Sequence, residues 1–253
     1  PYIPMIHSYN TDWYFPKNDF LAKNIFSTAY GIVCVSKEIE KKVSTKYGYK
    51  NLKTIYNPLE IDKIVSLSKE KIDLDFEYIF AAGRMVFDNN KQFDKMILAY
   101  AASRLPAQNV KLLLLGDGPQ KEYLQDLAKS EKLEDKIVFL DFQDNPFKFM
   151  KSARFTILTS KHEGLPNIIT ESLTCGVPVV AFDCKSGPAE LIENGKNGLL
   201  VEDQNFDAFV KAMNEMNENE TLWTACRENA FESIKRFSVE KIGAEWLEYL
   251  KIK

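Results

Sequence analysis

Short apolar runs alternate with helical stretches along most of this chain, and this alternation limits its possible folds more than any other feature. The expected strands are apolar at both alternating positions, as in strands covered on both faces of a sheet. They lie at 31–35, 76–82, 110–115, 136–140, 155–159, 177–182 and 198–201, and a further strand is expected at 2–7. Helices are expected at about 17–29, 36–47, 91–104, 119–131, 145–152, 167–175, 187–193, 205–217, 220–236 and 239–251. Repeated strand–helix alternation predicts a doubly wound α/β fold.

A boundary is expected near residues 58–75. Asn57 and Pro58 end an apolar run, and the stretch through Lys71 to Asp75 is polar and resembles a linker. What precedes has too few strands for a complete sheet, whereas a complete Rossmann-like unit follows. The predicted divisions are therefore 1–62, the C-terminal part of one α/β domain; 63–236, a whole second domain; and 237–253, a final helix. The chain begins at Pro1 rather than Met, so preceding sequence is expected to be missing.

Composition narrows the classes of function. The net charge of −3 argues against nucleic-acid binding, which usually needs a basic face. The four cysteines form no C-x-x-C pair and only two histidines occur, so no zinc site is expected and the cysteines are interpreted as buried free thiols. Asp73-Leu74-Asp75 has the form of a short metal-binding motif but is interpreted as a polar turn. No secretory signal pattern and no apolar run of membrane-spanning length is seen, which favours a cytoplasmic protein.

The segment from Glu163 to Glu171 is the strongest functional signal. A strand is expected to end near Ser160, and a helix to begin near Asn167, a good N-cap residue. Ligands of open α/β sheets bind outside the carboxyl ends of the strands. The first helical amides, at Ile168 and Ile169, can hold an anion. Glu163 and Glu171 would flank that anion pocket and accept hydrogen bonds from sugar hydroxyls. Taken alone, the pair would more simply be a turn residue and a solvated helical glutamate, because short motifs often match by chance.

The wider motif set resembles the C-terminal domain of family 4 retaining glycosyltransferases, which have the GT-B fold. The resemblance is strong over about 76–250 and weak over 1–60. It rests on the Glu-x7-Glu pair and on Gly164-Leu165-Pro166-Asn167, Gly176-Val177-Pro178-Val179-Val180, Ser186-Gly187-Pro188-x-Glu190 and Gly195-x-x-Gly198-Leu199-Leu200-Val201. It implies that Glu163 lies at the donor sugar and that Glu171 binds the ribose. It also implies that the loop amides from Gly164 through Leu165, Pro166, Asn167 and Ile168 to Ile169 hold sugar hydroxyls and phosphate.

Arg84 and Lys91 are the expected cations for a leaving diphosphate. Both follow a strand that ends at Gly83, which is itself a predicted donor contact. Negative charge that develops on a leaving phosphate must be stabilised by nearby cations when no metal does so. Taken alone, they could be surface charges at a strand end. In the resembled family an Arg and a Lys occur here for that purpose. This chain departs from the family pattern in a longer loop and in having Gln92 where Gly is common, which puts the alignment of Lys91 in question.

Three further positions have two interpretations each. The Gly116-Asp117-Gly118-Pro119 loop could border a phosphate or could be a plain turn. The resemblance places the backbone near Phe142 at the nucleotide base, although Phe142 could simply pack at a strand end. The resemblance also places His7 on the acceptor side of a cleft, although a lone histidine could be structural. The final helix would pack across the cleft toward the first domain.

The prediction is a metal-independent hexosyltransferase that needs no cofactor. It would transfer a sugar from a nucleoside-diphosphate sugar, most simply a UDP-sugar, to a hydroxyl acceptor with retention of configuration. Glu163, Arg84 and Lys91 would be the catalytic residues. The alternatives are a non-catalytic nucleotide-sugar-binding module or fragment and a nucleotide-sugar enzyme such as an epimerase. The Ser186-Gly187-Pro188 variant is similar to bacterial enzymes that build surface polysaccharides. This implies a glycan or lipid-linked acceptor and possible peripheral contact with the inner membrane.

Overall fold

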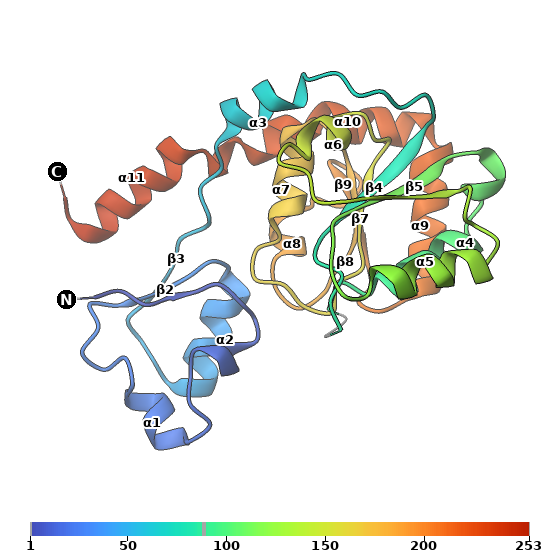
Figure 1. The fold of residues 1–253 in the computed structure, drawn as a ribbon. Helices are drawn as coiled ribbons and strands as arrows, with labels where there is room; N and C mark the ends of the chain where they lie inside the picture. Colours follow the sequence, from blue (N-terminus) through green and yellow to red (C-terminus); the bar gives the residue numbers. More distant parts are fainter. Residues whose placement is uncertain (1, 88–89, 253) are drawn as a thin grey trace.

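The structure, a computed structural model, describes residues 2–87 and 90–252 and contains two parallel sheets (Figure 1). The small sheet has the strand order β1-β2-β3 and the large sheet has the order β6-β5-β4-β7-β8-β9. The strands of the small sheet are β1 (Met5–Ile6), β2 (Ile32–Cys34) and β3 (Leu52–Thr54). Those of the large sheet are β4 (Tyr78–Ala82), β5 (Lys111–Leu115), β6 (Ile137–Leu140), β7 (Thr156–Leu158), β8 (Val179–Phe182) and β9 (Gly198–Val201).

Helices cover both faces of the large sheet. They are α4 (Phe93–Ala102), α5 (Lys121–Ser130), α6 (Phe147–Lys151), α7 (Asn167–Thr174), α8 (Pro188–Leu191), α9 (Phe206–Glu218) and α10 (Glu220–Ile234). Residues along β4 alternate between two cores, because successive side chains of a strand point to opposite faces. Tyr78 and Phe80 belong to the core that includes α6 and α7, whereas Ile79 and Ala81 belong to the core that includes α4, α5 and α9. The predicted doubly wound α/β architecture is confirmed.

The order of the large sheet reverses between two central strands. From β4 the chain runs outward through β5 to β6, and from β7 it runs the other way through β8 to β9. The boundary between β4 and β7 is therefore the topological switch point, where the loops after two adjacent strands diverge and leave a crevice. The expected catalytic residues Arg84, Lys91 and Glu163 follow these two strands.

The small sheet carries α1 (Asp19–Asn24) and α2 (Lys37–Tyr47), with the 3₁₀ turn η1 (Thr11–Trp13) after β1. The last helix, α11 (Val239–Leu250), runs back from the end of α10 toward this sheet (Figure 1). Its Ile242 is buried in one cluster with Val33 and Ile55 of the small-sheet region. The Tyr249 carbonyl accepts a hydrogen bond from the Tyr30 hydroxyl at 3.2 Å. Both ends of the described part of the chain thus lie in the small-sheet region.

One helix was not predicted, and one local expectation is wrong. The boundary region contains a helix, α3 (Ile61–Ser68), which packs against α6 and α7. Its apolar positions, Ile61, Ile64 and Val65, recur at helical spacing among polar residues, and burial against neighbouring helices stabilises it. Asn167 is the first residue of α7 rather than its N-cap, because Pro166 occupies the cap position with an extended backbone.

The expectation of buried free thiols is confirmed. Cys34, Cys175, Cys184 and Cys226 are all free and buried. Burial raises the pKa of the Cys34 and Cys175 thiols to about 12, so both stay protonated at neutral pH. A thiol is a poor nucleophile in that state. Two short 3₁₀ turns, η2 (Pro106–Gln108) and η3 (Lys235–Phe237), complete the described elements.

Candidate functional site

Lys91 and Glu163 form an ion pair at the switch point of the large sheet. Lys91 follows the β4 loop and Glu163 follows β7, and their Nζ and Oε1 atoms are 2.6 Å apart. The hydroxyl of Ser160 donates to the same Oε1 atom at 2.6 Å. The side chains are only 26% and 13% exposed, so solvent screens the pair less than it would a surface pair. Among the described residues no hydrogen bond ends on Oε2 of Glu163, which leaves this oxygen for a ligand.

The backbone around Lys91 is fixed by buried contacts. Gln92 is fully buried and has a left-handed backbone with φ of 53°. Its side-chain amide donates to the Thr159 carbonyl at 2.7 Å and to Gln204 Oε1 at 2.8 Å. Thr159 Oγ1 donates in turn to the carbonyl of Lys91 at 2.8 Å. A non-glycine residue in this region is strained by about 1–2 kcal/mol, and such strain is common near functional sites.

The ion pair lines a cavity of about 550 Å³ between the two sheets. His7 and Trp13 come from the small-sheet side, and Arg84 is exposed on the opposite wall. Arg84, Lys91 and Lys161 face a single carboxylate, Glu163, so the lining carries a positive balance suited to an anion. The full lining is His7, Ser8, Asn10, Trp13, Arg84, Val86, Asn90, Lys91, Lys161, His162, Glu163 and Gly164.

Gly164 is the point of closest approach between the two sides. A Cβ atom there would lie 1.9 Å from the carbonyl oxygen of His7, a distance that no side chain could occupy. The amide of Tyr9 donates to the carbonyl of Glu163 at 3.2 Å, which links the two backbones directly. His7 and Glu163 are therefore held on one cavity by backbone contact.

Glu171 lies in a different cavity from Glu163, contrary to the expectation that both flank one pocket. This second cavity, of about 320 Å³, lies between α3, α6 and α7 and also touches Leu165 and Asn167. The loop from Gly164 to Asn167 separates the two spaces. Burial raises the pKa of the Glu171 carboxyl, and the charge of Lys91 partly offsets this effect. The carboxylate therefore remains within electrostatic reach of the first cavity.

Three other expectations meet different outcomes. The Ile169 amide was expected to bind an anion. It instead donates to the Pro166 carbonyl at 3.0 Å, so this expectation is wrong. Phe142 is 72% exposed after β6, and neither of the two cavities includes it. In the β4 loop, Gly83 lies beside Lys91: a Cβ atom added at Gly83 would be 3.6 Å from Lys91 Cγ. Asp88 and Asn89 of this longer loop lie outside the described residues.

The glycine loop after β5 packs against the β4 loop. A Cβ atom at Gly116 would lie 2.1 Å from the Gly83 carbonyl oxygen, and one at Gly118 would lie 2.3 Å from that of Met85. The Met85 amide donates to the Asp117 carbonyl at 2.9 Å. These contacts give the two glycines a structural role, which is to let the loops approach closely behind Arg84.

Glu190 links the large-sheet region to the small sheet. Its carboxylate accepts from the Lys37 amide at 3.1 Å, at the start of α2, and from the Tyr56 hydroxyl at 2.8 Å. Nearby, Ser186 Oγ contacts Ser36 Oγ at 2.6 Å and donates to the carbonyl of Gly164 at 2.8 Å. A carboxylate at a helix N-terminus is stabilised by the unpaired amides and the helix dipole. The Ser186–Glu190 motif therefore joins both sides and supports the site loop.

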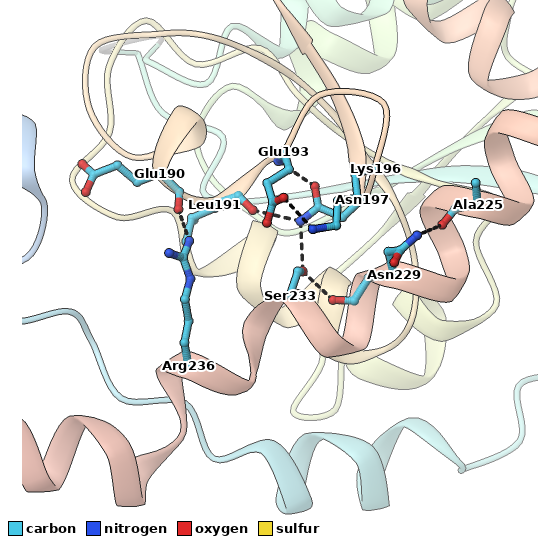
Figure 2. A network of polar contacts seen from close by, with 10 residues as sticks. Glu190, Leu191, Glu193, Lys196, Asn197, Ala225, Asn229, Ser233 and Arg236 are labelled. Atoms are coloured by element: carbon cyan, nitrogen blue, oxygen red, sulfur yellow. Dashed lines mark hydrogen bonds and ion pairs between the residues drawn. The ribbon is translucent and has the colours of Figure 1, made fainter.

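The neighbouring loop is held by a buried asparagine (Figure 2). Asn197 donates to the carbonyl of Leu191 at 3.0 Å and to Ser233 Oγ at 2.9 Å, and it accepts from the amide of Glu193. Arg236 donates to the backbone carbonyl of Glu190, while the Glu190 carboxylate points away from it (Figure 2). This network fixes the 190–198 loop and leaves the carboxylate directed toward α2.

Sequence reasoning missed several residues of this arrangement. Ser160 lies three residues before Glu163, and Trp13 lies six after His7. The contact of Ser160 with Glu163 depends on the loop conformation, and the exposure of Trp13 depends on how η1 is packed. Glu190 was part of the quoted motif, but its partners lie more than 130 residues away in the chain. The presence of Trp13 close to His7 in the sequence could have indicated that it also lies at the site.

Residues 62–233 match the family model described as glycosyl transferases group 1. The chain is 34% identical over 201 residues to N-acetylgalactosamine-N,N'-diacetylbacillosaminyl-diphospho-undecaprenol 4-alpha-N-acetylgalactosaminyltransferase of Campylobacter jejuni. That match covers 79% of this chain and 54% of the relative. An uncharacterised glycosyltransferase of Methanocaldococcus jannaschii is 30% identical, with 95% of this chain and 68% of the relative covered. The chain thus spans about half to two thirds of the length of these relatives.

Solved structures share the fold. Anabaena HepE in complex with UDP matches 99% of this chain and 72% of its own, with a TM-score of 0.84 and 23% identity. Staphylococcus aureus TarM, in a complex with UDP, matches 98% of this chain and 50% of its own, with a TM-score of 0.82 and 23% identity. The predicted GT-B fold is confirmed by these likenesses.

Proposed function

Because the chain belongs to the glycosyl transferases group 1 family, we propose that the full-length protein is a retaining glycosyltransferase. It transfers a hexosyl group from a nucleoside-diphosphate sugar, most simply a UDP-sugar, to a hydroxyl of a glycan or lipid-linked acceptor. The observation that carries this proposal is the cavity at the switch point, where Lys91 and Glu163 pair at 2.6 Å beside Arg84.

In the proposed step one bond forms, one bond breaks and one proton is transferred. The acceptor oxygen bonds to the anomeric carbon on the face that the diphosphate leaves, and the bond from that carbon to the phosphate oxygen breaks. The leaving oxygen keeps the bonding electrons and takes the proton of the acceptor hydroxyl. Arg84 and Lys91 stabilise the charge that develops on the phosphate. Glu163 orients the sugar through its Oε2 atom and holds Lys91 in place through Oε1.

The nucleoside end would extend toward Glu171. Its carboxylate can accept hydrogen bonds from the two ribose hydroxyls, and the cavity around it is lined by polar groups such as Asn167 and Thr170. The loop from Gly164 to Asn167 would lie against the diphosphate, between the two cavities. This division into a sugar end and a nucleoside end supports a two-part donor such as a nucleotide-sugar.

The test is a turnover assay of the full-length protein with radiolabelled nucleotide-sugars. Glu163→Gln and Arg84→Ala are each expected to lower kcat by roughly a hundredfold or more, the scale of removing one charge-stabilising group. The control is Glu228→Gln, an exposed glutamate on α10, which should transfer at the wild-type rate. Wild-type turnover by Glu163→Gln would sink the assignment. UDP binding by calorimetry without any turnover would instead favour the binding-module alternative.

We propose that the reaction needs neither a metal nor a cofactor. Within residues 2–87 and 90–252, no group of three or more His, Cys, Asp or Glu side chains is arranged to hold a metal ion. The cations of the cavity supply charge stabilisation that a divalent metal could otherwise supply. Turnover should therefore persist in excess EDTA, and its loss with recovery on addition of Mg²⁺ would contradict this part of the proposal.

We propose a cytoplasmic location with peripheral contact to the inner membrane. Of the helices in the described part of the chain, none has the length and apolar character to cross a bilayer. Phe20 and Leu21 of α1 are 75% and 54% exposed, next to the basic Lys17 and Lys23. Apolar side chains beside cations suit an anionic lipid surface. Co-sedimentation of the full-length protein with phosphatidylglycerol vesicles, lost in Phe20→Ser/Leu21→Ser, would support it; no sedimentation would refute it.

A further inference from the structure

Trp13 presents an exposed indole to the cavity at the switch point. The side chain is 72% exposed and lines the cavity on the small-sheet side, next to His7 and Asn10. Tryptophan is usually largely buried, because its large apolar surface is costly to hydrate. An exposed indole in a cavity with otherwise mostly polar walls is therefore a candidate for ligand contact.

The backbone that carries Trp13 is firmly held. The side chain of Asn10 caps η1 by accepting from the Asp12 amide at 3.2 Å. Thr11 is fully buried and contacts the Tyr47 hydroxyl at 3.0 Å, while the Phe15 ring stacks on the Tyr47 ring with centroids 4.0 Å apart. The residues on both sides of Trp13 are thus anchored to α2. The exposure of the indole results from this placement and not from a loose segment.

The opposite wall of the cavity already has an assigned use. Arg84, Lys91 and Glu163 all belong to the large-sheet region, and the proposed function gives them to the donor. The small-sheet wall offers Trp13, with Ser8 and Asn10 as polar neighbours. A flat apolar surface bordered by hydrogen-bonding groups suits a sugar ring, whose one face presents C–H groups and whose rim presents hydroxyls.

We propose that Trp13 is the platform on which the acceptor sugar stacks, and that this acceptor residue is a hexopyranose. The inference rests on the proposed function and deepens it by naming the acceptor class. A cyclic sugar has a continuous C–H face to lay on the indole, whereas an acyclic polyol such as ribitol or glycerol has none. The acceptor hydroxyl then lies across the cavity from the Lys91–Glu163 pair, where the anomeric carbon of the donor is expected.

Direct binding can be followed by fluorine NMR of the full-length protein labelled with 5-fluorotryptophan. The Trp13 resonance is assigned by its loss in Trp13→Phe, and the resonances of Trp223 and Trp246, away from the cavity, are internal controls. With UDP present, methyl β-glucopyranoside, methyl β-galactopyranoside and methyl N-acetyl-β-glucosaminide are added in turn, beside ribitol and glycerol. A shift of the Trp13 resonance with at least one pyranoside and with neither polyol is expected. No shift with any pyranoside, or an equal shift with ribitol, overturns the proposal.

Kinetics with the pyranoside that shifts the resonance give a second test. Trp13→Ala should raise the KM for that acceptor by roughly tenfold or more, the scale on which buried contact tryptophans act. UDP affinity and the slow hydrolysis of the donor by water should be unchanged. The matched control is Tyr123→Ala, an aromatic residue on α5 that is 51% exposed and does not line the cavity; its acceptor KM should stay at the wild-type value.

The outcomes separate this proposal from the proposed function. If the wild-type protein binds no nucleotide and hydrolyses no nucleotide-sugar, the proposed function fails. If it does both and Trp13→Ala has the wild-type acceptor KM, only the role of Trp13 fails. A Trp13 resonance that shifts with donor alone, and not with any pyranoside, assigns the indole to the donor and overturns the inference.

Discussion

Glu171 faces opposing requirements of stability and binding. Its carboxyl group is mostly withdrawn from water between α3 and α7, and this burial raises its pKa above the ordinary value of 4.5. An acid whose folded-state pKa is raised binds its proton more tightly in the folded protein. The stability that this provides is present below the unfolded pKa and is lost as pH rises through the folded pKa. At neutral pH the buried charge therefore costs stability while it remains available to a ligand.

The first prediction concerns Glu171→Gln. The amide keeps the size of the side chain but carries no charge, so the free energy of unfolding at pH 7 should increase. Its decline between about pH 4.5 and pH 7 should also flatten, on the linkage argument. The affinity for UDP, by contrast, should fall, since an amide accepts hydrogen bonds from two ribose hydroxyls less well. Urea unfolding at both pH values and calorimetry with UDP measure the two effects, and a variant that is less stable at pH 7 contradicts the account.

Single residues also show which features of the site the sequence could predict and which it could not. Arg84, Lys91 and Glu163 could be predicted to lie together, because the carboxyl ends of parallel strands share one edge of a sheet. The conformation of Gln92 could not be predicted, since its left-handed backbone is stabilised by contacts of its side chain with Thr159, just after β7, and with Gln204. The separation of Glu163 and Glu171 into two cavities also depends on the path of the 164–167 loop, which no spacing specifies.

At the scale of elements, α11 stabilises the small sheet. Three strands with helices on one side leave an apolar face open, and α11 covers it through Ile242, with Trp246 and Tyr249 packed nearby. The apolar face of this helix was readable from its periodicity. The neighbouring α3 was not predicted, because its apolar positions extend over only eight residues and gain partners on α6 and α7, which are distant in the sequence.

The second prediction is that Ile242→Ala destabilises the small-sheet region. Ile242 is 1% exposed, so its truncation leaves a cavity, and the free energy of unfolding should fall by about 2–5 kcal/mol. Val239→Ala, on the same helix but at a position that is 46% exposed, is the matched control and should change it by less than about 0.5 kcal/mol. Urea denaturation of both variants decides the point; equal effects would mean that α11 does not stabilise the sheet through this contact.

At the scale of the whole molecule, the two sheets are joined by polar contacts remote from the chain connection. Glu190 bonds the first amides of α2 and the Tyr56 hydroxyl, while Ser186 contacts Ser36 and the carbonyl of Gly164. The same short segment therefore touches both the small-sheet region and the loop beside Glu163. The placement of His7 and Trp13 across from the donor residues depends on this joint.

The third prediction is that Glu190→Ala loosens this joint. The Lys37 and Glu38 amides lose a charged acceptor worth about 1.5–3 kcal/mol, so their hydrogen exchange should accelerate by roughly ten- to a hundredfold. Glu193→Ala, which removes only an exposed ion pair with Lys196, is the control. Mass spectrometry of exchanged peptides measures both. Unchanged exchange at the start of α2 would show that the carboxylate does not hold the two sheets together.

The contact at Gly164 has a mechanical consequence. The backbone of Gly164 is compatible with an ordinary residue, and the obstacle to a methyl group is the His7 carbonyl, 1.9 Å from where it would lie. The methyl group of alanine at this position would therefore clash with the His7 carbonyl when the small-sheet and large-sheet regions are in contact. It would not clash when the two regions are further apart. Solution scattering should show Gly164→Ala as a more extended particle than the wild type. The missing side chain at Gly164 thus sets how closely the small-sheet and large-sheet regions can approach each other.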